Sequence, residues 1–268
     1  MEISILSDLI CKRLDEDKFN IETQWSKDQN TRFAVIDNLL PEEIVGKIYS
    51  AFPKDKETFL KRKSFREKKS TLANFENVPD ILSSITEAFQ TEKVIKKVSS
   101  LVNMESLEPD PSLYAGGLSM MFEEDFLNPH IDNSHDASRS RYRRLNLLYY
   151  VSPEWELENG ANFELWDEKV KNATTIVSKY NRLVLMETHS KSWHSVSRNH
   201  ISRARCCVSN YYFSQNSPSG KDYFHITAFM GRPEERLKRV TSFFDNSLRQ
   251  TIAQLTKTGR GKGQVRKK

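Results

Sequence analysis

The chain has 268 residues, of which 37% are apolar and 29% charged, so it is long and apolar enough for one catalytic domain with added helices. No run approaches the length of a membrane span, residues 1–8 lack the basic start and apolar stretch of a signal peptide, and three cysteines make no disulfide framework. We therefore expect a cytoplasmic protein in a reducing compartment, without membrane contact.

Residues 1–105 are expected to form a helical support region. A proline followed by two acidic residues at 41–43 predicts a helix that runs to about residue 52, because these residues suit the first turn. The lysine-rich segment 54–69 is polar, which predicts an exposed loop over the functional site of the chain. Apolar residues recur at roughly helical spacing over residues 79–98, which predicts a second helix.

Residues 106–230 are expected to form a core of short strands bounded by turn residues. A proline at 233 then begins a last helix within residues 231–256. One face of this helix is apolar and carries Leu237, Val240, Phe244, Leu248, Ile252 and Leu255. We expect this face to pack on the outside of the strand core or to serve a dimer.

The best candidate for a metal site begins at His130 and Asp132. They are two residues apart, so in a strand both side chains point to the same side and can chelate one ion. His194 follows the apolar strand at 183–186 after a short polar loop and is the expected third ligand. Two imidazoles and one carboxylate form the facial triad of non-haem Fe(II) oxygenases. The other histidines, His135, His189, His200 and His225, are expected to be loop or structural residues.

The sequence around these residues resembles a known family from about residue 114 to residue 214. The matching pieces are Pro-His-Ile-Asp-Asn at 129–133, Arg-Leu-Asn-Leu-Leu-Tyr-Tyr-Val at 144–151, Asn-Gly-Ala-Asn-Phe-Glu-Leu-Trp at 159–166, Tyr-Asn-Arg-Leu at 180–183 and Arg-Cys-Cys-Val-Ser-Asn-Tyr-Tyr-Phe at 205–213. In motifs and their order this segment resembles the prolyl-hydroxylase type of 2-oxoglutarate and Fe(II) dependent dioxygenases. Within that family, hypoxia-sensing and ribosomal-protein prolyl hydroxylases look most similar.

The resemblance implies an α+β fold with a double-stranded β-helix, or jelly-roll, core flanked by N-terminal helices and a C-terminal helix. In the family, an arginine or lysine on the strand after the distal histidine binds the far carboxylate of 2-oxoglutarate. Arg205 is expected in this role, because it stands eight residues before Phe213, as the family's arginine stands before its closing aromatic residue. A guanidinium also suits the role, since it can bind both carboxylate oxygens. Arg203 has the same strand parity and stays an alternative. Tyr150 matches a position whose hydroxyl also contacts 2-oxoglutarate, and core packing is the other interpretation.

The resemblance implies hydroxylation of an unactivated C–H bond. The enzyme would bind Fe(II), consume 2-oxoglutarate and O2, and release succinate and CO2 as co-products. Ascorbate is expected as an accessory cofactor. The expected substrate is a prolyl residue or a proline-like molecule. Two departures leave this open: Gly160 is followed by Ala161 where the family usually has a second glycine, and Met120 and Leu127 stand where peptide-binding relatives often have tyrosines. The alternatives are a hydroxylase of a small metabolite, such as an amino acid or sugar derivative, and a cupin-like, non-catalytic binding module.

A last feature is the basic C-terminal tail, residues 257–268. It carries six cations and no acid, and without it the net charge changes from +5 to −1. These cations are Lys257, Arg260, Lys262, Arg266, Lys267 and Lys268. The tail is expected to be a flexible, solvated terminus, and contact with RNA, a ribosome or another polyanion is the functional alternative.

Overall fold

The computed structural model describes residues 1–256 and 265–266. In this part of the chain, twelve strands form one curled antiparallel sheet. The strands are β1 (Phe33–Asp37), β2 (Leu60–Lys63), β3 (Glu67–Leu72), β4 (Gly117–Met121), β5 (Phe126–Ile131), β6 (Tyr142–Tyr150), β7 (Phe163–Trp166), β8 (Ala173–Ile176), β9 (Arg182–Glu187), β10 (His194–Val196), β11 (Arg205–Ser214) and β12 (Ala228–Phe229). Their order is β1-β9-β6-β11-β4-β3-β5-β10-β7-β8, with β12 beside β5 and β2 beside β3. This is the expected jelly-roll core of an α+β protein.

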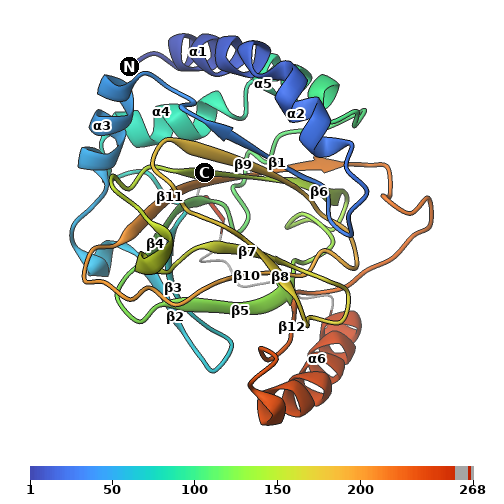
Figure 1. The fold of residues 1–268 in the computed structure, drawn as a ribbon. Coiled ribbons are helices and arrows are strands. Elements are labelled where there is room, and N and C mark those ends of the chain that lie inside the picture. Colours follow the sequence, from blue (N-terminus) through green and yellow to red (C-terminus); the bar gives the residue numbers. More distant parts are fainter. Residues whose placement is uncertain (257–264, 267–268) are drawn as a thin grey trace.

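Six α-helices accompany the sheet in the described residues: α1 (Ile3–Glu16), α2 (Lys18–Trp25), α3 (Glu42–Ala51), α4 (Asp80–Ala88), α5 (Glu92–Leu101) and α6 (Arg236–Thr256). Short 3-10 turns, η1 (Lys56–Thr58) and η2 (Leu157–Asn159), add to them. The first five helices cover the outer face of the β1-β9-β6-β11 half, whereas α6 lies at the opposite end of the molecule (Figure 1). None of the described helices is long and apolar enough to cross a membrane.

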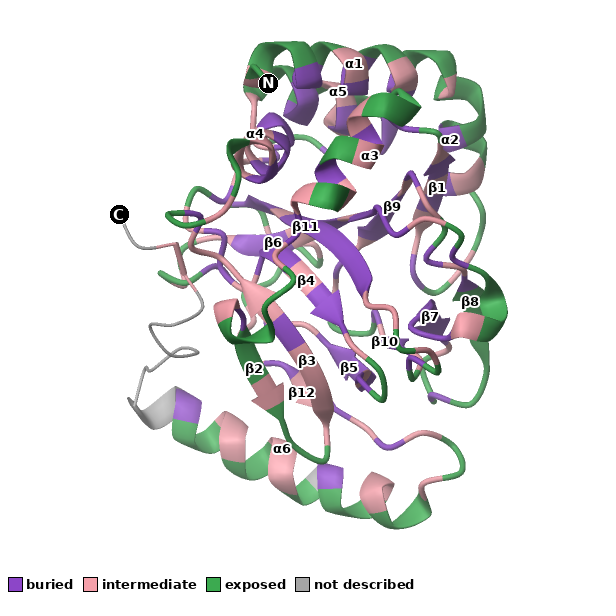
Figure 2. Cartoon of the chain, turned by 90° about the vertical axis from the view of Figure 1, so that its left-hand side faces the viewer, coloured by how far each residue is buried: buried purple, intermediate pink, exposed green. Residues whose placement is uncertain are grey.

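The central strands β6 and β11 are buried on both faces. In β6, residues 145, 147 and 149 belong to the core shared with the helices, and residues 146, 148 and 150 line an inner cavity. In β11, residues 206, 208 and 212 face the helices, and residues 205, 207, 209 and 211 line the same cavity. Figure 2 shows these strands as buried and the outer helical faces as exposed. The period of two in a strand thus separates a structural face from a chemical one.

The prediction of one helix over residues 79–98 was wrong in its length, because α4 and α5 are separate. The turn between them is held by Gln90, whose side-chain nitrogen donates to Asn210 Oδ1 at 2.6 Å and whose side-chain oxygen accepts from Asp110 N at 2.7 Å. The apolar spacing continues through this turn, so the sequence pattern does not reveal it.

The prediction of an exposed loop over residues 54–69 was also wrong. The segment contains η1, β2 and the start of β3, and β3 pairs with both β4 and β5. It therefore forms part of the barrel wall. Strand β1, which pairs with β9, also lies in the region expected to be helical. Lysine side chains dominate the local composition of 54–69, and only pairing with distant strands makes the segment a wall of the core.

The C-terminal tail lies outside the described residues except for residues 265–266. Arg266 donates its backbone N–H to Ser112 O at 2.7 Å, and its guanidinium pairs with Glu87 at 2.8 Å. The structure therefore accounts for one of the six tail cations, as part of an intramolecular ion pair.

Ala161 sits where the family usually has a second glycine. Its φ is +47° and that of Gly160 is +74°. A Cβ on Gly160 would lie 1.8 Å from Arg198 O, so this first glycine is required by a close backbone approach. Ala161 shows that the second position also needs a positive φ, which alanine adopts at a cost of about 1 kcal/mol.

Asn181 joins the helical layer to the sheet, and we expect Asn181→Ala to lower the free energy of unfolding by about 2–4 kcal/mol. Its side-chain oxygen accepts from Leu40 N at 3.1 Å and from the Tyr149 hydroxyl at 2.9 Å, and its nitrogen donates to Leu40 O at 2.7 Å. Alanine would leave these buried groups unsatisfied. Urea denaturation checks this, with Asn20→Ala on the exposed side of α2 as the control; equal stability of the two variants would contradict it.

Candidate active site

The sheet register brings His130 and His194 face to face. His130 lies near the end of β5, His194 begins β10, and the two are direct partners in the antiparallel pair. Their rings are 4.0 Å apart between centroids. Asp132 follows β5 immediately, with its carboxylate 3.6 Å from His130 Nε2 and 3.5 Å from His194 Nε2. Each residue offers one ligand atom, and these three atoms lie within 4.8 Å of one another.

Backbone carbonyls orient both imidazoles. His130 Nδ1 lies 3.0 Å from Asn128 O, and His194 Nδ1 lies 2.9 Å from Ser192 O. These contacts assign the proton to Nδ1 in each ring and leave Nε2 with a lone pair directed at Asp132. Burial first, and then the neighbouring His194, lowers the pKa of His130 to about 4. The neutral form, which is the form that binds a metal, is therefore the stable one near pH 7.

The Asp132 carboxylate is held in its ionised form. Arg143 Nη1 donates to Asp132 Oδ2 at 3.1 Å, and Asn146 Nδ2 donates to the same oxygen at 2.8 Å. Burial opposes the charge, but the Arg143 guanidinium acts against it, and the pKa of Asp132 lies well below its usual value. Two imidazole nitrogens and one ionised carboxylate thus converge on one point, which fits a divalent metal such as Fe(II).

Arg205 lies in the same cavity as this cluster. The cavity has a volume of about 70 Å³ and is lined by His130, Asp132, His194, Tyr150 and Arg205, among others. Arg205 is only 4% exposed, and its Nε has no hydrogen-bond partner. Among the described residues it forms no ion pair with a carboxylate. A buried guanidinium without a counter-ion is costly, so this group fits an anionic ligand that enters the cavity.

Residues 116–213 match the family model of the 2OG-Fe(II) oxygenase superfamily. In this segment the chain is similar to the 2OG-Fe(II) oxygenase superfamily. The match covers the metal cluster and Arg205, from β4 to β11. A comparison with curated proteins found no significant match.

Solved structures show the same fold for the oxygenase domain and its helices. A prolyl 4-hydroxylase from Phytophthora capsici is 14% identical, with a TM-score of 0.54, over 93% of this chain and 77% of that one. A prolyl 4-hydroxylase from Pseudomonas putida is 11% identical, with a TM-score of 0.52, over 72% of this chain and 98% of that one. SnoN, a non-haem α-ketoglutarate dependent epimerase of nogalamycin biosynthesis, is 12% identical, with a TM-score of 0.50, over 82% and 87%. The family match indicates a dioxygenase enzyme, and the solved structures show a prolyl-hydroxylase-like fold.

The structure distinguishes the alternative site residues of the oxygenase. Arg203 lies outside the cavity, where its guanidinium donates to Glu154 O at 2.7 Å and lies over the Trp155 ring. Tyr150 lines the cavity, with its ring 5.1 Å from the Arg205 guanidinium, and burial raises the pKa of its hydroxyl. Tyr149 faces the helices instead. The structure therefore brings Arg205 and Tyr150 to the cluster, and leaves Arg203 outside.

Sequence reasoning missed three polar residues around the cavity. Asn146 and Arg143 contact Asp132, and Lys69 reaches the cavity from β3. Asn146 carried a signal, because it is the one polar residue in the run 145–151 and shares the parity of Tyr150. Lys69 had no such signal, since its segment looked like a loop.

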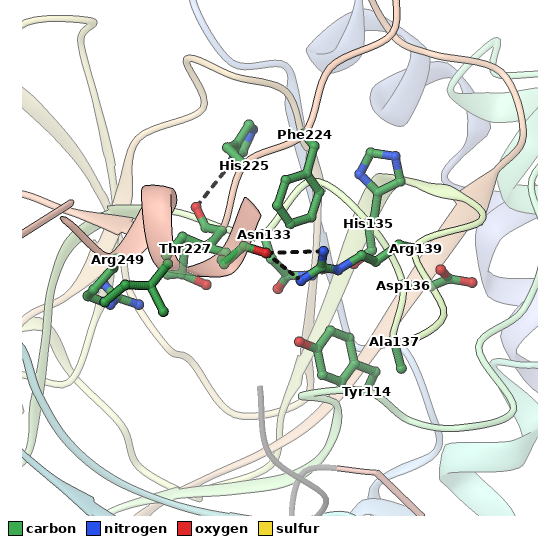
Figure 3. A pocket seen from close by; sticks show the side chains of 13 residues that line it. Tyr114, Asn133, His135, Asp136, Ala137, Arg139, Phe224, His225, Thr227 and Arg249 are labelled. Carbon is green, nitrogen blue, oxygen red and sulfur yellow. Dashed lines mark hydrogen bonds between the residues drawn. The ribbon is translucent and has the colours of Figure 1, made fainter. Parts of the chain in front are cut away.

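The remaining histidines do not join the cluster. His135 and His225 line a second cavity of about 210 Å³ between residues 133–139, residues 224–227 and α6 (Figure 3). Asn133, next to Asp132 in the chain, also lines this cavity. His189 lies near Asn30, with its Nε2 3.0 Å from Asn30 O, and His200 is exposed. That these four histidines are loop or structural residues stays a prediction.

Proposed function

We propose that this dioxygenase hydroxylates an unactivated C–H bond of a prolyl residue or a proline-like substrate. It would use Fe(II), 2-oxoglutarate and O2 and release succinate and CO2. One observation supports the proposal: two kinds of group line the same cavity. They are the cluster of His130, Asp132 and His194, and the buried Arg205. The cluster suits a metal, and the arginine suits the far carboxylate of 2-oxoglutarate.

In this proposal His130 and His194 hold the metal through Nε2, and Asp132 holds it through its carboxylate. A bound Fe(II) would supply the redox chemistry by which 2-oxoglutarate and O2 oxidise the substrate. The carbonyls of residues 128 and 192 keep the imidazoles in the binding tautomer, and Arg143 and Asn146 fix the carboxylate.

Arg205 would grip the far carboxylate of 2-oxoglutarate through two parallel hydrogen bonds, and the Tyr150 hydroxyl would donate a further one. The ring of Phe163 lies 5.8 Å from His194, and Leu148 and Val196 also line the cavity. These apolar groups exclude water from the reacting atoms, which favours attack on the substrate over side reactions.

A hydroxylase of a small metabolite is the second candidate. Leu127 lines the cavity at a position where peptide-binding relatives often have a tyrosine. The likeness in fold to an epimerase of nogalamycin biosynthesis shows that this fold also serves proteins named for other reactions. Incubation with a panel of proline-containing peptides, free amino acids and sugar derivatives distinguishes the two candidates, since only a true substrate gains one oxygen atom by mass spectrometry.

The proposed cofactor chemistry is tested by anaerobic titration of the purified protein with Fe(II) and 2-oxoglutarate. A visible absorption band of the ternary complex is expected, together with succinate when air is admitted. Absence of both band and succinate would leave the fold with the non-catalytic, cupin-like role. Ascorbate as an accessory cofactor, a cytoplasmic location and polyanion contact through the basic tail stay predictions from the sequence, as do the segment boundaries at 105, 230 and 256.

Asn146 is expected to position Asp132, so Asn146→Leu should lower the affinity for a divalent metal about tenfold. The change removes the 2.8 Å bond to Asp132 Oδ2 but keeps the size of the side chain. Calorimetric titration with Mn(II) measures the effect without turnover. Asn210→Leu is the control, because it makes the same change on the helix-facing side of β11. Equal Mn(II) affinity of wild type and Asn146→Leu would contradict the positioning role.

A further inference from the structure

Residues 228–232, which lead from the sheet towards α6, lie along the strand that carries His130, and we call them the bridging segment. Strand β12 pairs with β5, with Phe229 directly opposite His130. Their rings stack, with centroids 5.4 Å apart and planes at 21°. One residue further on, Met230 N donates to Pro129 O at 2.8 Å. The first half of the bridging segment thus contacts both the backbone and the ring of one candidate metal ligand.

The other half of the bridging segment reaches the strand that carries His194. Arg232 donates to the Glu164 carboxylate through two nitrogens, at 2.6 and 3.3 Å, and to Val196 O at 3.4 Å. The same carboxylate accepts from the hydroxyl of Ser195, which is its cross-strand neighbour and is fully buried. A bidentate, largely buried pair of this kind has a fixed geometry. Arg232 therefore holds β10 at the two residues that follow His194.

Strand β10 needs such support because it is short. It has three residues, and its register with β5 shifts between His194 and Val196. A ladder of this length fixes the position of a side chain only loosely, because few hydrogen bonds hold it and the irregularity interrupts them. A metal site instead requires its ligand atoms within a few tenths of an ångström of their ideal distances. Contacts from outside the ladder must supply this precision for His194.

Helix α6 lies beside β12 and holds the bridging segment through polar side chains (Figure 1). Asn246 accepts from Phe229 N at 3.0 Å and donates to Phe229 O at 2.6 Å. Arg239 donates to Gly231 O at 3.1 Å. A Cβ on Gly231 would lie 2.8 Å from Arg239 N, so the segment packs tightly against the first turns of the helix. The position of the bridging segment is thus tied to that of α6.

Three apolar residues of α6 that were expected to pack on the strand core do not take part in this attachment. Leu237 is 85% exposed, Val240 60% and Leu248 62%. The expectation was therefore wrong for these residues, and a role of the apolar face in a dimer stays a prediction. The polar side of the helix carries the attachment instead, where Asn246 and Gln250 bind backbone groups that precede the helix.

We propose that the bridging segment sets the distance between His130 and His194, with Arg232 and Glu164 as positioning residues for the metal site. The inference rests on the metal site of the proposed function and adds residues outside the catalytic cavity to it. Side chains alternate along a strand, so Glu164 and its partner Ser195 point away from the cavity that His194 lines. The segment thus acts on the ligands from the outer face of the barrel wall.

Isothermal titration of the full chain with Mn(II) tests the positioning role. Arg232→Met is expected to lower the Mn(II) affinity about tenfold, as is usual for groups that orient metal ligands. Arg232→Lys should lose less, because it keeps the charge and one hydrogen bond to Glu164. The visible spectrum of bound Co(II), which depends on ligand geometry, should also change in Arg232→Met. Equal Mn(II) affinity of wild type and Arg232→Met would overturn the proposal.

Arg32→Met is the matched control. Arg32 also binds a glutamate through two nitrogens, at 2.7 and 2.6 Å to Glu187, and lies over the Trp25 ring as Arg232 lies over Trp166. Glu187 ends β9, which carries none of the three candidate ligands. The control should lower the melting temperature as Arg232→Met does, with Mn(II) affinity within about twofold of wild type. An equal loss of Mn(II) affinity in both variants would show that affinity merely follows stability, and would overturn the proposal.

The coupling is reciprocal, so bound Mn(II) should in turn stabilise the bridging segment. Hydrogen exchange followed by mass spectrometry is expected to slow about fivefold in the peptide 226–236 at saturating Mn(II), and to stay unchanged in α1. Unchanged exchange of this peptide in a wild type that binds Mn(II) would overturn the bridging role and leave the metal site standing. A wild type that binds no Mn(II) would overturn the metal site, and this inference with it.

Discussion

His194→Ala is expected to lower the rate of succinate formation from 2-oxoglutarate by more than about a thousandfold, because the metal contributes several kcal/mol to the reaction. His194 is the ligand that comes from a distant strand, and it offers Nε2 only because β10 pairs with β5 in the observed register. Its loss leaves His130 and Asp132 as a two-ligand site.

A second readout separates metal loss from misfolding. Mn(II) at a hundred times its dissociation constant should stabilise wild type by about 2.7 kcal/mol, which raises the melting temperature by several degrees. His194→Ala should melt cooperatively without this rise. His200→Ala, an exposed histidine outside the cluster, is the control and should keep both turnover and the Mn(II) effect. Turnover by His194→Ala within tenfold of wild type would remove His194 from the ligand set.

Arg205→Met is expected to raise the concentration of 2-oxoglutarate needed for half-saturation about a hundredfold, which corresponds to roughly 3 kcal/mol for a buried bidentate contact. Arg205→Lys should recover only part of the affinity, since an ammonium group cannot form two parallel hydrogen bonds in one plane. Both variants are compared by titration of 2-oxoglutarate against Mn(II)-loaded protein, so the result does not depend on turnover.

Arg205→Met should also stabilise the protein without 2-oxoglutarate by about 1–3 kcal/mol, because the wild type buries a guanidinium without a carboxylate partner. Higher stability with lower affinity is the pattern of a residue selected for binding. Arg203→Met is the matched control: it removes an arginine of the same strand parity that binds Glu154 outside the cavity, and 2-oxoglutarate affinity should change less than about twofold. A larger effect at Arg203 than at Arg205 would reverse the assignment.

The candidate metal residues could be predicted, because part of the pattern that indicates them is local in the sequence. The spacing of His130 and Asp132 is a property of one strand, and His194 follows a recognisable strand and loop. Arg205 and Arg203 have the same parity, so strand geometry alone left both open. Only the fold separates them: β11 begins at Arg205 and pairs with β4, whereas Arg203 lies before the strand and turns to Glu154.

Elements that depend on long-range pairing were predicted less well. Residues 54–69 look like a solvated loop, because they are polar and do not alternate between apolar and polar residues. A strand that is held by pairing with distant strands need not show this alternation. The break between α4 and α5 depends on Gln90, whose partners Asn210 and Asp110 are far away in the chain. In both cases the deciding contacts join segments whose proximity no local pattern encodes.

The sequence by itself determined the residue chemistry of this protein: a histidine and an aspartate at chelating spacing, a second histidine after an apolar strand, and a C-terminal helix with one apolar side. The tertiary structure alone decided which way that side points, that Lys69 reaches the cavity, and that Arg143 and Asn146 hold Asp132. The physical reason is that spacing and periodicity are local properties of a strand or helix. Orientation and partner choice instead follow from the free energy of all contacts together, including the hydrogen bonds that turn the polar face of α6 inward.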